Sequence, residues 1–293
     1  MRISTSRQSI EEIFLQNGYV TDQPAAAALH LVQALRKPLL IEGPAGVGKT
    51  EMAKVLAQSL NTRLIRLQCY EGLDVASALY EWNYAKQMLH IRLMEKEGAA
   101  LAEKEAAIFS DSFLLSRPLL QALTEERQPP VLLIDEVDRA DEEFEAFLLE
   151  MLAEFQMTIP ELGTIRAKHR PYVILTSNRT RELSDALRRR CLYQWIDYPD
   201  FQKEAAILQA RLPSINERLA AQIAGMMEEL RRMPLHKAPG VAESIDWAEA
   251  LLLLHYNELS KEAVQETLGC FIKDREDWEA VKEAIESGIL IQL

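Results

Sequence analysis

The stretch GPAGVGKT, residues 43–50, decides the fold of this chain because it fits the pattern G-x-x-x-x-G-K-[ST] at every position. A chain of phosphates is held best by several backbone N–H groups that point inward. A loop can curl that tightly only where side chains are absent, as at Gly46 and Gly48. The helix expected from about Gly48 adds unpaired amides and the positive end of its dipole. The stretch therefore predicts a phosphate-binding loop.

The residues that close this loop add charge and a metal ligand. Lys49 can reach the outer phosphates of a nucleotide, and the Thr50 hydroxyl can ligate Mg²⁺. The alternative is a glycine-rich turn with an incidental lysine, which the β-prone run before the loop and the helical pattern after it disfavour. The predicted nucleotide-binding residues of this segment are Gly43, Pro44, Ala45, Gly46, Val47, Gly48, Lys49, Thr50 and Glu51.

Five short apolar, β-prone runs alternate with longer helical patterns. The runs lie at residues 38–42, 63–67, 131–136, 172–177 and 193–198. Runs that are apolar on both faces are typical of parallel strands covered by helices on each side. The clearest helical pattern is DEEFEAFLLEMLAEF, residues 141–155. We therefore predict an α/β fold with a doubly wound, parallel, five-stranded sheet.

The β signal fades after Asp200, and the remaining runs have helical spacing with prolines and a glycine between them. We expect an α/β domain at 1–198 and an all-helical domain at 199–293, joined at the YPD sequence of residues 198–200. The long helix-prone segment at about 69–109 fits the α/β sandwich poorly, and we interpret it as an insertion.

Composition limits the classes of function. The formal net charge of −12 argues against nonspecific binding to duplex nucleic acid, which needs clustered Lys and Arg. No apolar run is long enough to cross a bilayer, and Glu11 and Glu12 interrupt the place of a signal peptide. We expect a cytoplasmic protein with three reduced thiols, at Cys69, Cys191 and Cys270.

The run VLLIDE, residues 131–136, supplies two acids at the end of a predicted buried strand. Ligands bind outside the carboxyl ends of strands in open α/β sheets. Asp135 can therefore hold Mg²⁺, and Glu136 can activate a water molecule as a general base. The alternative, solvated acids after an apolar strand, remains fair for the nearby acids Asp138, Asp141 and Glu142.

Two further elements fit hydrolysis at the γ-phosphate of a nucleotide. Asn178 ends the run YVILTSN and can position the attacking water, although a turn asparagine is the alternative. Arg188, Arg189 and Arg190 gather at the end of a helical pattern, which is costly unless an anion lies near. They indicate an arginine finger, a cation that acts on the nucleotide of a neighbouring subunit, and we favour Arg189 and Arg190.

In this order, the motifs resemble those of the AAA+ ATPases. GPAGVGKT resembles Walker A, VLLIDE resembles Walker B, LTSN resembles sensor 1, and ALRRRC resembles the arginine-finger helix. Within AAA+, long stretches such as 63–92 and 173–199 are similar to the MoxR family and to its CoxD-like branch. The resemblance covers nearly the whole chain.

The resemblance implies properties that the residues alone do not. It implies a hexameric ring with ATP and Mg²⁺ at subunit interfaces, a client-facing insert within 69–109, a hairpin at about 156–172 and a helical lid after Asp200. It implies a partner with a von Willebrand factor A domain. It also implies a chaperone-like role in the maturation of a metalloenzyme, such as a molybdenum hydroxylase.

Two positions bear on contacts from the lid and from the N-terminal segment. The family commonly has a sensor 2 arginine where this chain reads LHKAPGVAESIDWAEAL, residues 235–251, and Lys237 is either its substitute or a plain loop cation. Tyr19 and Val20 lie where the family's N-terminal segment passes the adenine, and apolar packing is the alternative. We also expect Trp195 and Trp247 to lie in the core.

The leading hypothesis is an oligomeric, Mg²⁺-dependent ATP hydrolase that remodels a protein client. A nucleic-acid motor on the same core is the second hypothesis, and the acidic charge balance counts against it. The third is a nucleotide-gated adaptor with little turnover, which the missing lid arginine keeps open.

Overall fold

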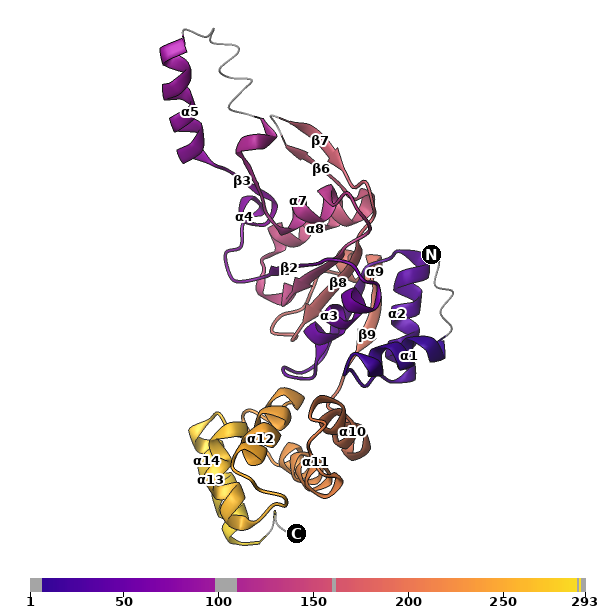
Figure 1. The fold of residues 1–293 in the computed structure, drawn as a ribbon, viewed down its shortest axis with the longest axis vertical. Coiled ribbons are helices and arrows are strands. Elements are labelled where there is room, and N and C mark those ends of the chain that lie inside the picture. The colour runs from indigo at the N-terminus through magenta and orange to yellow at the C-terminus, as the bar shows by residue number, and fades with distance from the viewer. Residues whose placement is uncertain (1–6, 98–109, 160–161, 289, 291–293) are drawn as a thin grey trace. The chain divides into compact units, whose positions relative to one another are not determined.

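The structure contains a five-stranded sheet (Figure 1). The computed structural model describes residues 7–97, 110–159, 162–288 and 290. The strand order across the sheet is β2-β5-β8-β1-β9. The strands are β1 (Leu39–Glu42), β2 (Leu64–Gln68), β5 (Val131–Asp135), β8 (Tyr172–Ser177) and β9 (Leu192–Trp195). The predicted α/β class and the five predicted strands are confirmed.

The strands of this sheet run parallel. Gln68 of β2 is the register partner of Asp135 of β5, and Leu133 of β5 is the partner of Ile174 of β8. Parallel strands bring their carboxyl ends to one edge of the sheet. Residues that end β2, β5 and β8 are therefore neighbours, although the chain separates them widely.

Contacts group the chain into two compact units. The loop unit comprises Met1–Ala27, Glu42–Val55 and Trp195–Leu293, and the sheet unit comprises Ala28–Ile41 and Leu56–Gln194. Two helices run from one unit into the other, α2 (Gln23–Leu35) and α3 (Lys49–Ser59). The boundary near residue 198 between an α/β domain and a helical domain stays a prediction.

The sheet unit has a continuous apolar core between its strands and helices. Helix α8 (Glu142–Glu154) begins at Asp141, whose carboxylate accepts a hydrogen bond from the Phe144 amide at 2.8 Å. The helix buries its apolar stripe against the core of the unit. The other helical elements described in this unit are α4 (Val75–Leu79), α5 (Tyr84–Glu97), α7 (Pro118–Thr124), α9 (Asp185–Arg190), η1 (Asp111–Phe113) and η2 (Val137–Arg139).

Two small antiparallel sheets accompany the main one. Strand β3 (Tyr80–Trp82) pairs with β4 (Leu114–Ser116), and β6 (Gln156–Ile159) pairs with β7 (Gly163–Arg166). Two aromatic side chains in and after β3 differ in burial, since Trp82 is buried and Tyr84 is exposed. The last part of the predicted insertion, residues 98–109, lies outside the described residues.

The loop unit consists mainly of helices, and four of them begin at a capping side chain. Side chains at the N-caps Asp200, Asn216, Ser260 and Asp274 accept hydrogen bonds from first-turn amides. These residues precede α10 (Phe201–Arg211), α11 (Glu217–Arg232), α13 (Lys261–Phe271) and α14 (Arg275–Glu286); α1 (Arg7–Gln16) and α12 (Val241–Leu253) complete the set that is described.

The two tryptophans expected in the core differ. Trp247 is fully buried, and its ring centroid lies 4.3 Å from that of Phe271. Trp195 is 40% exposed, so its predicted place in the core is wrong. The reason is topological, because Trp195 is the last residue of β9, which is an edge strand of the sheet.

Within the described part of the chain, no helix combines the length and apolar character needed to cross a membrane.

Candidate active site

The phosphate-binding loop leads directly from β1 into α3. A Cβ atom at Gly43 would stand 1.9 Å from the carbonyl oxygen of Ile196, so a side chain at this position cannot fit. Gly46 has φ of 76°, a left-handed conformation that side chains disfavour. The two glycines are thus required for different reasons, close backbone approach and backbone conformation. The loop has the local geometry that the pattern predicts.

The Lys49 ammonium is held by the loop that it closes. Its side chain folds back so that Nζ donates to the carbonyl oxygens of Gly43 at 2.7 Å and Pro44 at 2.5 Å. Lys49 is only 6% exposed. The positive charge is therefore fixed inside the curl of the loop, among the groups predicted to receive phosphates.

Glu51 is engaged by cations of its own unit. Its carboxylate accepts from Lys54 at 3.0 Å and from Arg211 at 3.0 Å. Partial burial acts to raise the pKa of Glu51, but the hydrogen bonds and charges of Lys54 and Arg211 outweigh it and lower the pKa below its ordinary value. Glu51 therefore serves to link α3 with α10 within the loop unit.

Tyr19 lies against the same loop. Its ring passes 3.6 Å from where a Cβ atom of Gly48 would stand, and it meets Phe14 edge-on with 5.8 Å between centroids. Burial, followed by the charges of Asp22 and Glu51, raises the pKa of the phenol. Val20 is half-buried. The structure thus places Tyr19 beside the loop, and its contact with a base stays a prediction.

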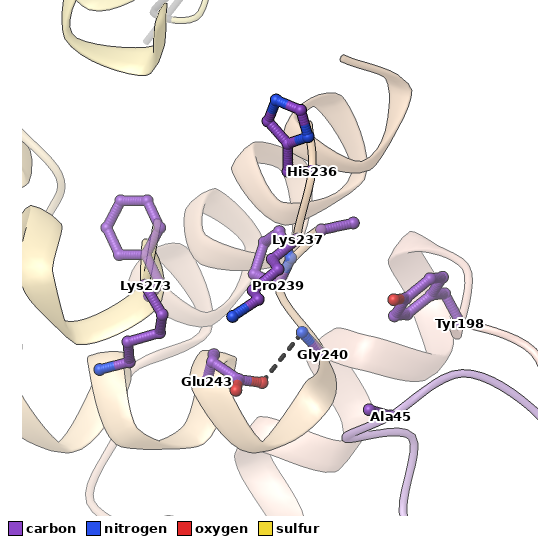
Figure 2. A pocket seen from close by; sticks show the side chains of 10 residues that line it. Ala45, Tyr198, His236, Lys237, Pro239, Gly240, Glu243 and Lys273 are labelled. Atoms are coloured by element: carbon purple, nitrogen blue, oxygen red, sulfur yellow. Dashed lines mark hydrogen bonds between the residues drawn. The ribbon is translucent and has the colours of Figure 1, made fainter. Parts of the chain in front are cut away.

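The start of α12 also touches the loop. The backbone amides of Val241 and Ala242 donate to the carbonyl oxygen of Gly46, at 2.9 and 3.2 Å. The Gly240 amide donates to the Glu243 carboxylate at 3.0 Å, as Figure 2 shows. We call this set of contacts the loop latch. It uses helix N-terminal amides, which have no partners inside their own helix.

A pocket of about 370 Å³ opens beside the latch (Figure 2). Among the described residues of its wall, the basic ones are His236, Lys237 and Lys273. The Lys237 amide donates to Asp277 at 2.9 Å, which holds the backbone of this segment in place. Lys237 therefore lies on the wall of a pocket that also includes Ala45 of the phosphate-binding loop.

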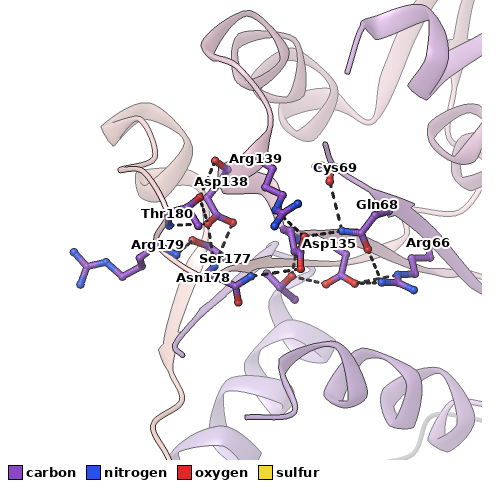
Figure 3. Close-up of polar contacts among 12 residues, drawn as sticks. Arg66, Gln68, Cys69, Asp135, Asp138, Arg139, Ser177, Asn178, Arg179 and Thr180 are labelled. Atoms are coloured by element: carbon purple, nitrogen blue, oxygen red, sulfur yellow. Dashed lines mark hydrogen bonds and ion pairs between the residues drawn. The ribbon is translucent and has the colours of Figure 1, made fainter. Parts of the chain in front are cut away.

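Asp135 ends β5 and is 2% exposed. Its Oδ2 accepts from Arg66 Nε at 3.0 Å and from Arg66 Nη2 at 2.6 Å, and its Oδ1 accepts from the Thr176 hydroxyl at 2.5 Å. Figure 3 shows Arg66 reaching from the neighbouring strand toward Asp135. A guanidinium and a hydroxyl thus both donate hydrogen bonds to this buried carboxylate.

Glu136 lies beside several polar groups. Its φ of 54° is uncommon for a residue with a side chain, and its amide donates to Thr176 Oγ1 at 2.9 Å. Its Oε2 accepts from Gln68 Nε2 at 3.1 Å and lies 3.1 Å from Arg139 Nε. Its Oε1 lies 3.5 Å from Asn178 Nδ2. The fold brings the predicted base and the predicted water-orienting amide together.

Asp138 is not solvated, contrary to one interpretation of the acid-rich stretch. It is 2% exposed and accepts from the amides of Asn178 at 3.2 Å and Thr180 at 2.9 Å. The Thr180 hydroxyl donates to it at 2.7 Å. Asp138 therefore holds the segment after β8, on which Asn178 stands (Figure 3). These partners lie 40 and 42 positions away, so their contact was invisible in the sequence.

The arginine run occupies the end of α9. The Arg189 side chain is 83% exposed and lies 4.0 Å from Asp185, whereas Arg190 donates to the Ala186 carbonyl at 3.1 Å. Arg188 is half-buried. The exposed guanidinium of Arg189 is compatible with contact to another subunit, and the finger role stays a prediction.

Residues 39–196, more than half of the chain, match the family described as ATPase family associated with various cellular activities (AAA). The chain therefore belongs to the AAA family. This membership and the P-loop fold support ATP binding and hydrolysis as its general chemistry.

Several proteins are similar over much of the chain. An uncharacterized protein of Staphylococcus haemolyticus is 25% identical, covering 86% of this chain and 90% of its own length. The denitrification regulatory protein NirQ of Stutzerimonas stutzeri is 25% identical, covering 71% of this chain and 68% of its own. The RuvB Holliday junction branch migration motor of Thermotoga maritima superposes with a TM-score of 0.50 at 18% identity, over 90% of this chain and 74% of that one, which supports the fold.

We call Asp135, Glu136, Asp138 and the polar side chains that contact them the acid cluster. The sequence did not identify four of those polar side chains, namely Arg66, Gln68, Thr176 and Arg139. One signal was present in β2, where exposed Arg66 and Gln68 alternate with buried Ile65 and Leu67. Alternation places Arg66 and Gln68 on one face of the strand.

Proposed function

We propose that the chain is a Mg²⁺-dependent ATP hydrolase. The single observation that carries the proposal is the cluster at the carboxyl ends of β5 and β8, where buried Asp135 precedes Glu136 and Asn178 lies against Glu136. Hydrolysis needs a metal ligand, a base and a group that orients water. The cluster contains a candidate for each.

The residues fit a magnesium ion. Mg²⁺ usually binds through one or two carboxylates together with substrate phosphates, and it keeps several water ligands. Asp135, an oxygen ligand at the end of a buried strand, has this chemistry, and Thr50 supplies a hydroxyl at the start of α3. When bound, the metal neutralises charge on the phosphates. Lys49 binds phosphates, and Glu136 accepts a proton from water.

We further propose a MoxR-type function, in which a hexameric ring remodels a protein client. Support comes from the sequence stretches similar to that family and from similarity to NirQ, which its name links to the regulation of denitrification. In this proposal Arg189 or Arg190 acts on the nucleotide of a neighbouring subunit. The partner has a von Willebrand factor A domain, and the client is a metalloenzyme under maturation.

A second candidate is a nucleotide-gated adaptor that binds ATP with little turnover. It is favoured by the pocket beside the loop latch, whose basic wall residues are lysines and a histidine where the family commonly has an arginine. The rate at saturating ATP, at protein concentrations where a ring forms, separates the two candidates. A burst of one turnover without a steady rate would favour the adaptor.

Glu136→Gln tests the proposed chemistry. Loss of a general base lowers turnover by about 100-fold or more, while affinity for ATP stays within about twofold. Glu142→Gln is the matched control, because Glu142 is an exposed acid at the start of α8 and loses the same charge. Full turnover in Glu136→Gln would refute the base assignment. The same variant, loaded with ATP, is the form to use in capturing client and partner.

A further inference from the structure

Arg66 forms an ion pair with the buried metal-ligand candidate Asp135. It donates two hydrogen bonds to one carboxylate oxygen, at 3.0 and 2.6 Å, while Thr176 donates to the other oxygen. The two side chains differ greatly in exposure, 2% for Asp135 and 49% for Arg66. One partner is thus fixed in the protein interior, whereas the other reaches it from the surface.

This asymmetry has a physical consequence. An ionised carboxylate removed from water needs a countercharge, because burying it alone is costly. Arg66 supplies that charge and also fills hydrogen-bonding positions on Oδ2. A divalent cation at Asp135 would provide the same neutralisation. Two cations on one carboxylate repel one another, so binding of either one disfavours the other.

We propose that Arg66 is a resident counter-ion that the incoming metal displaces from Asp135. The inference rests on the proposed function, since it assumes that Asp135 receives Mg²⁺ together with a nucleotide. Arg66 has room to move, because about half of its side chain faces solvent. Breaking its pair with Asp135 is part of the cost of binding the metal.

The same guanidinium connects the metal ligand with the proposed base. Arg66 Nη2 donates to Gln68 Oε1 at 2.5 Å, and Gln68 Nε2 donates to Glu136 Oε2 at 3.1 Å. Figure 3 shows Arg66, Gln68 and Asp135 lying in one chain of contacts. Movement of Arg66 removes one of the contacts that orient the Gln68 amide. Binding of a metal ion at Asp135 thereby alters a hydrogen bond to Glu136.

The test measures how strongly metal assists nucleotide binding. The dissociation constant of adenylyl imidodiphosphate, which is not hydrolysed, is determined by calorimetry in EDTA and again in saturating Mg²⁺. The dissociation constant in EDTA divided by that in Mg²⁺ is the metal-assistance ratio. It reports how much the metal strengthens nucleotide binding, without any turnover. For Arg66→Gln we expect this ratio to rise about tenfold over wild type, the size expected from removing charged hydrogen bonds to a half-exposed group.

Three further variants make the result specific. Arg63→Gln is the matched control, since Arg63 precedes the same strand, is 57% exposed and pairs with Gln121 and Glu125 instead. Its ratio should equal that of wild type. In an Asp135→Asn background, Arg66→Gln should have no effect on the ratio, because the shared carboxylate is gone. If Arg66→Gln fails to fold, Arg66→Lys keeps the charge with fewer donors and should raise the ratio about threefold.

The outcomes separate this inference from the proposed function. A ratio that is unchanged or lower in Arg66→Gln overturns the displacement, and means that Arg66 stays on Asp135 in the loaded protein. Failure of wild type to bind the analogue under either condition refutes the proposed function itself. A rise in the ratio that also occurs with Arg63→Gln would show a general charge effect and would overturn the specific role of Arg66.

Discussion

The side-chain amide of Gln68 donates to the carboxylate of Glu136 across 3.1 Å, although 68 positions separate them in the chain. Arg139 Nε lies 3.1 Å from the same oxygen. Two donors on one carboxylate oxygen hold it in place and occupy lone pairs through which it would otherwise contact a water molecule. The proposed base is thus restrained by its neighbours.

Removing the Gln68 amide should therefore raise basal turnover. For Gln68→Ala we expect an increase of about fivefold in kcat, the effect of one lost hydrogen bond, with ATP affinity unchanged. Steady-state phosphate release measures it. Gln128→Ala is the control, because Gln128 is exposed and donates to the Asn61 carbonyl instead. A fall in kcat would mean that Gln68 positions the base productively.

The loop latch should depend on the absence of a side chain at Gly240. Its φ of −86° suits any residue, but a Cβ there would stand 2.9 Å from Gly46 Cα and 3.0 Å from the Ala45 carbonyl oxygen. Gly240→Ala should therefore push the α12 amides off the loop. We expect about tenfold weaker ATP binding and faster hydrogen exchange at Val241 and Ala242.

Gly225→Ala is the matched control for this prediction. A Cβ at Gly225 meets Phe201 at an ordinary 3.7 Å, and the position lies inside α11. The substitution should raise the free energy of unfolding by up to about 1 kcal/mol and leave ATP binding unchanged. Normal exchange at Val241 in Gly240→Ala would show that the latch absorbs the added methyl group.

The buried pair of Arg231 and Glu204 should carry much of the stability of the helices around the pocket. Their side chains are 8% and 1% exposed, and Arg231 Nη2 donates to Glu204 Oε1 at 2.7 Å. Ser244 donates to the same carboxylate, and Arg231 Nε donates to the Pro239 carbonyl at 2.8 Å. The pair thereby fixes the segment that leads into the latch.

Arg231→Met should lower the free energy of unfolding by about 3–5 kcal/mol, because it leaves the Glu204 charge buried and unpaired. Urea denaturation followed by circular dichroism measures the change. Adding Glu204→Leu should recover part of the loss, since no buried charge then remains. Equal stability of the single and double variants would contradict this explanation.

Two thiols should resist alkylation. Burial raises the pKa of Cys69 to about 12, with further effects from the charges of Asp135, Asp138 and Glu136. Burial raises the pKa of Cys191 to about 12 as well, although Arg190 opposes it. Because the thiolate is the reactive form, iodoacetamide at pH 8.5 should modify native protein at Cys270 before the other two. Mass spectrometry of peptides measures the order.

The same shifts predict a pH dependence of stability. In the unfolded chain these thiols lose their protons near their ordinary pKa of about 9, whereas in the folded protein they keep them to about 12. The folded state therefore binds more protons between these values. The contribution of these two thiols to the free energy of unfolding is fully present below about pH 9 and is lost as the pH rises toward 12. Substituting both cysteines with alanine should flatten that decline.

Local sequence patterns predicted the fold well. The five apolar runs became the five strands of the sheet, because burial on both faces of a parallel strand leaves a continuous apolar signature. The phosphate-binding loop was also predictable, since its conformation depends on glycines and a helix start within eight consecutive residues. The family resemblance rested on this stretch together with VLLIDE, LTSN and ALRRRC, and membership of the AAA family was confirmed by the match over residues 39–196.

The acid cluster was predictable only in part. Asp135, Glu136 and Asn178 could be named because each follows an apolar strand, and the parallel sheet brings those ends together. The predicted core position of Trp195 and the solvated alternative for Asp138 were wrong, because burial of a single polar or aromatic side chain depends on which distant segment covers it. Their own neighbours in sequence carry no such information.

By itself, the sequence determined the elements whose cause is local: strands, helix starts and the curl of residues 43–50. Tertiary structure alone decided the two ion pairs on buried carboxylates. Arg66 meets Asp135 from 69 positions away because β2 and β5 pair in one register, and Arg231 meets Glu204 because α10 and α11 pack together. A shift of one residue in the β2–β5 register or in the packing of α10 on α11 would turn these side chains to another face. The packing of the whole core selects the register and the helix contact that are observed.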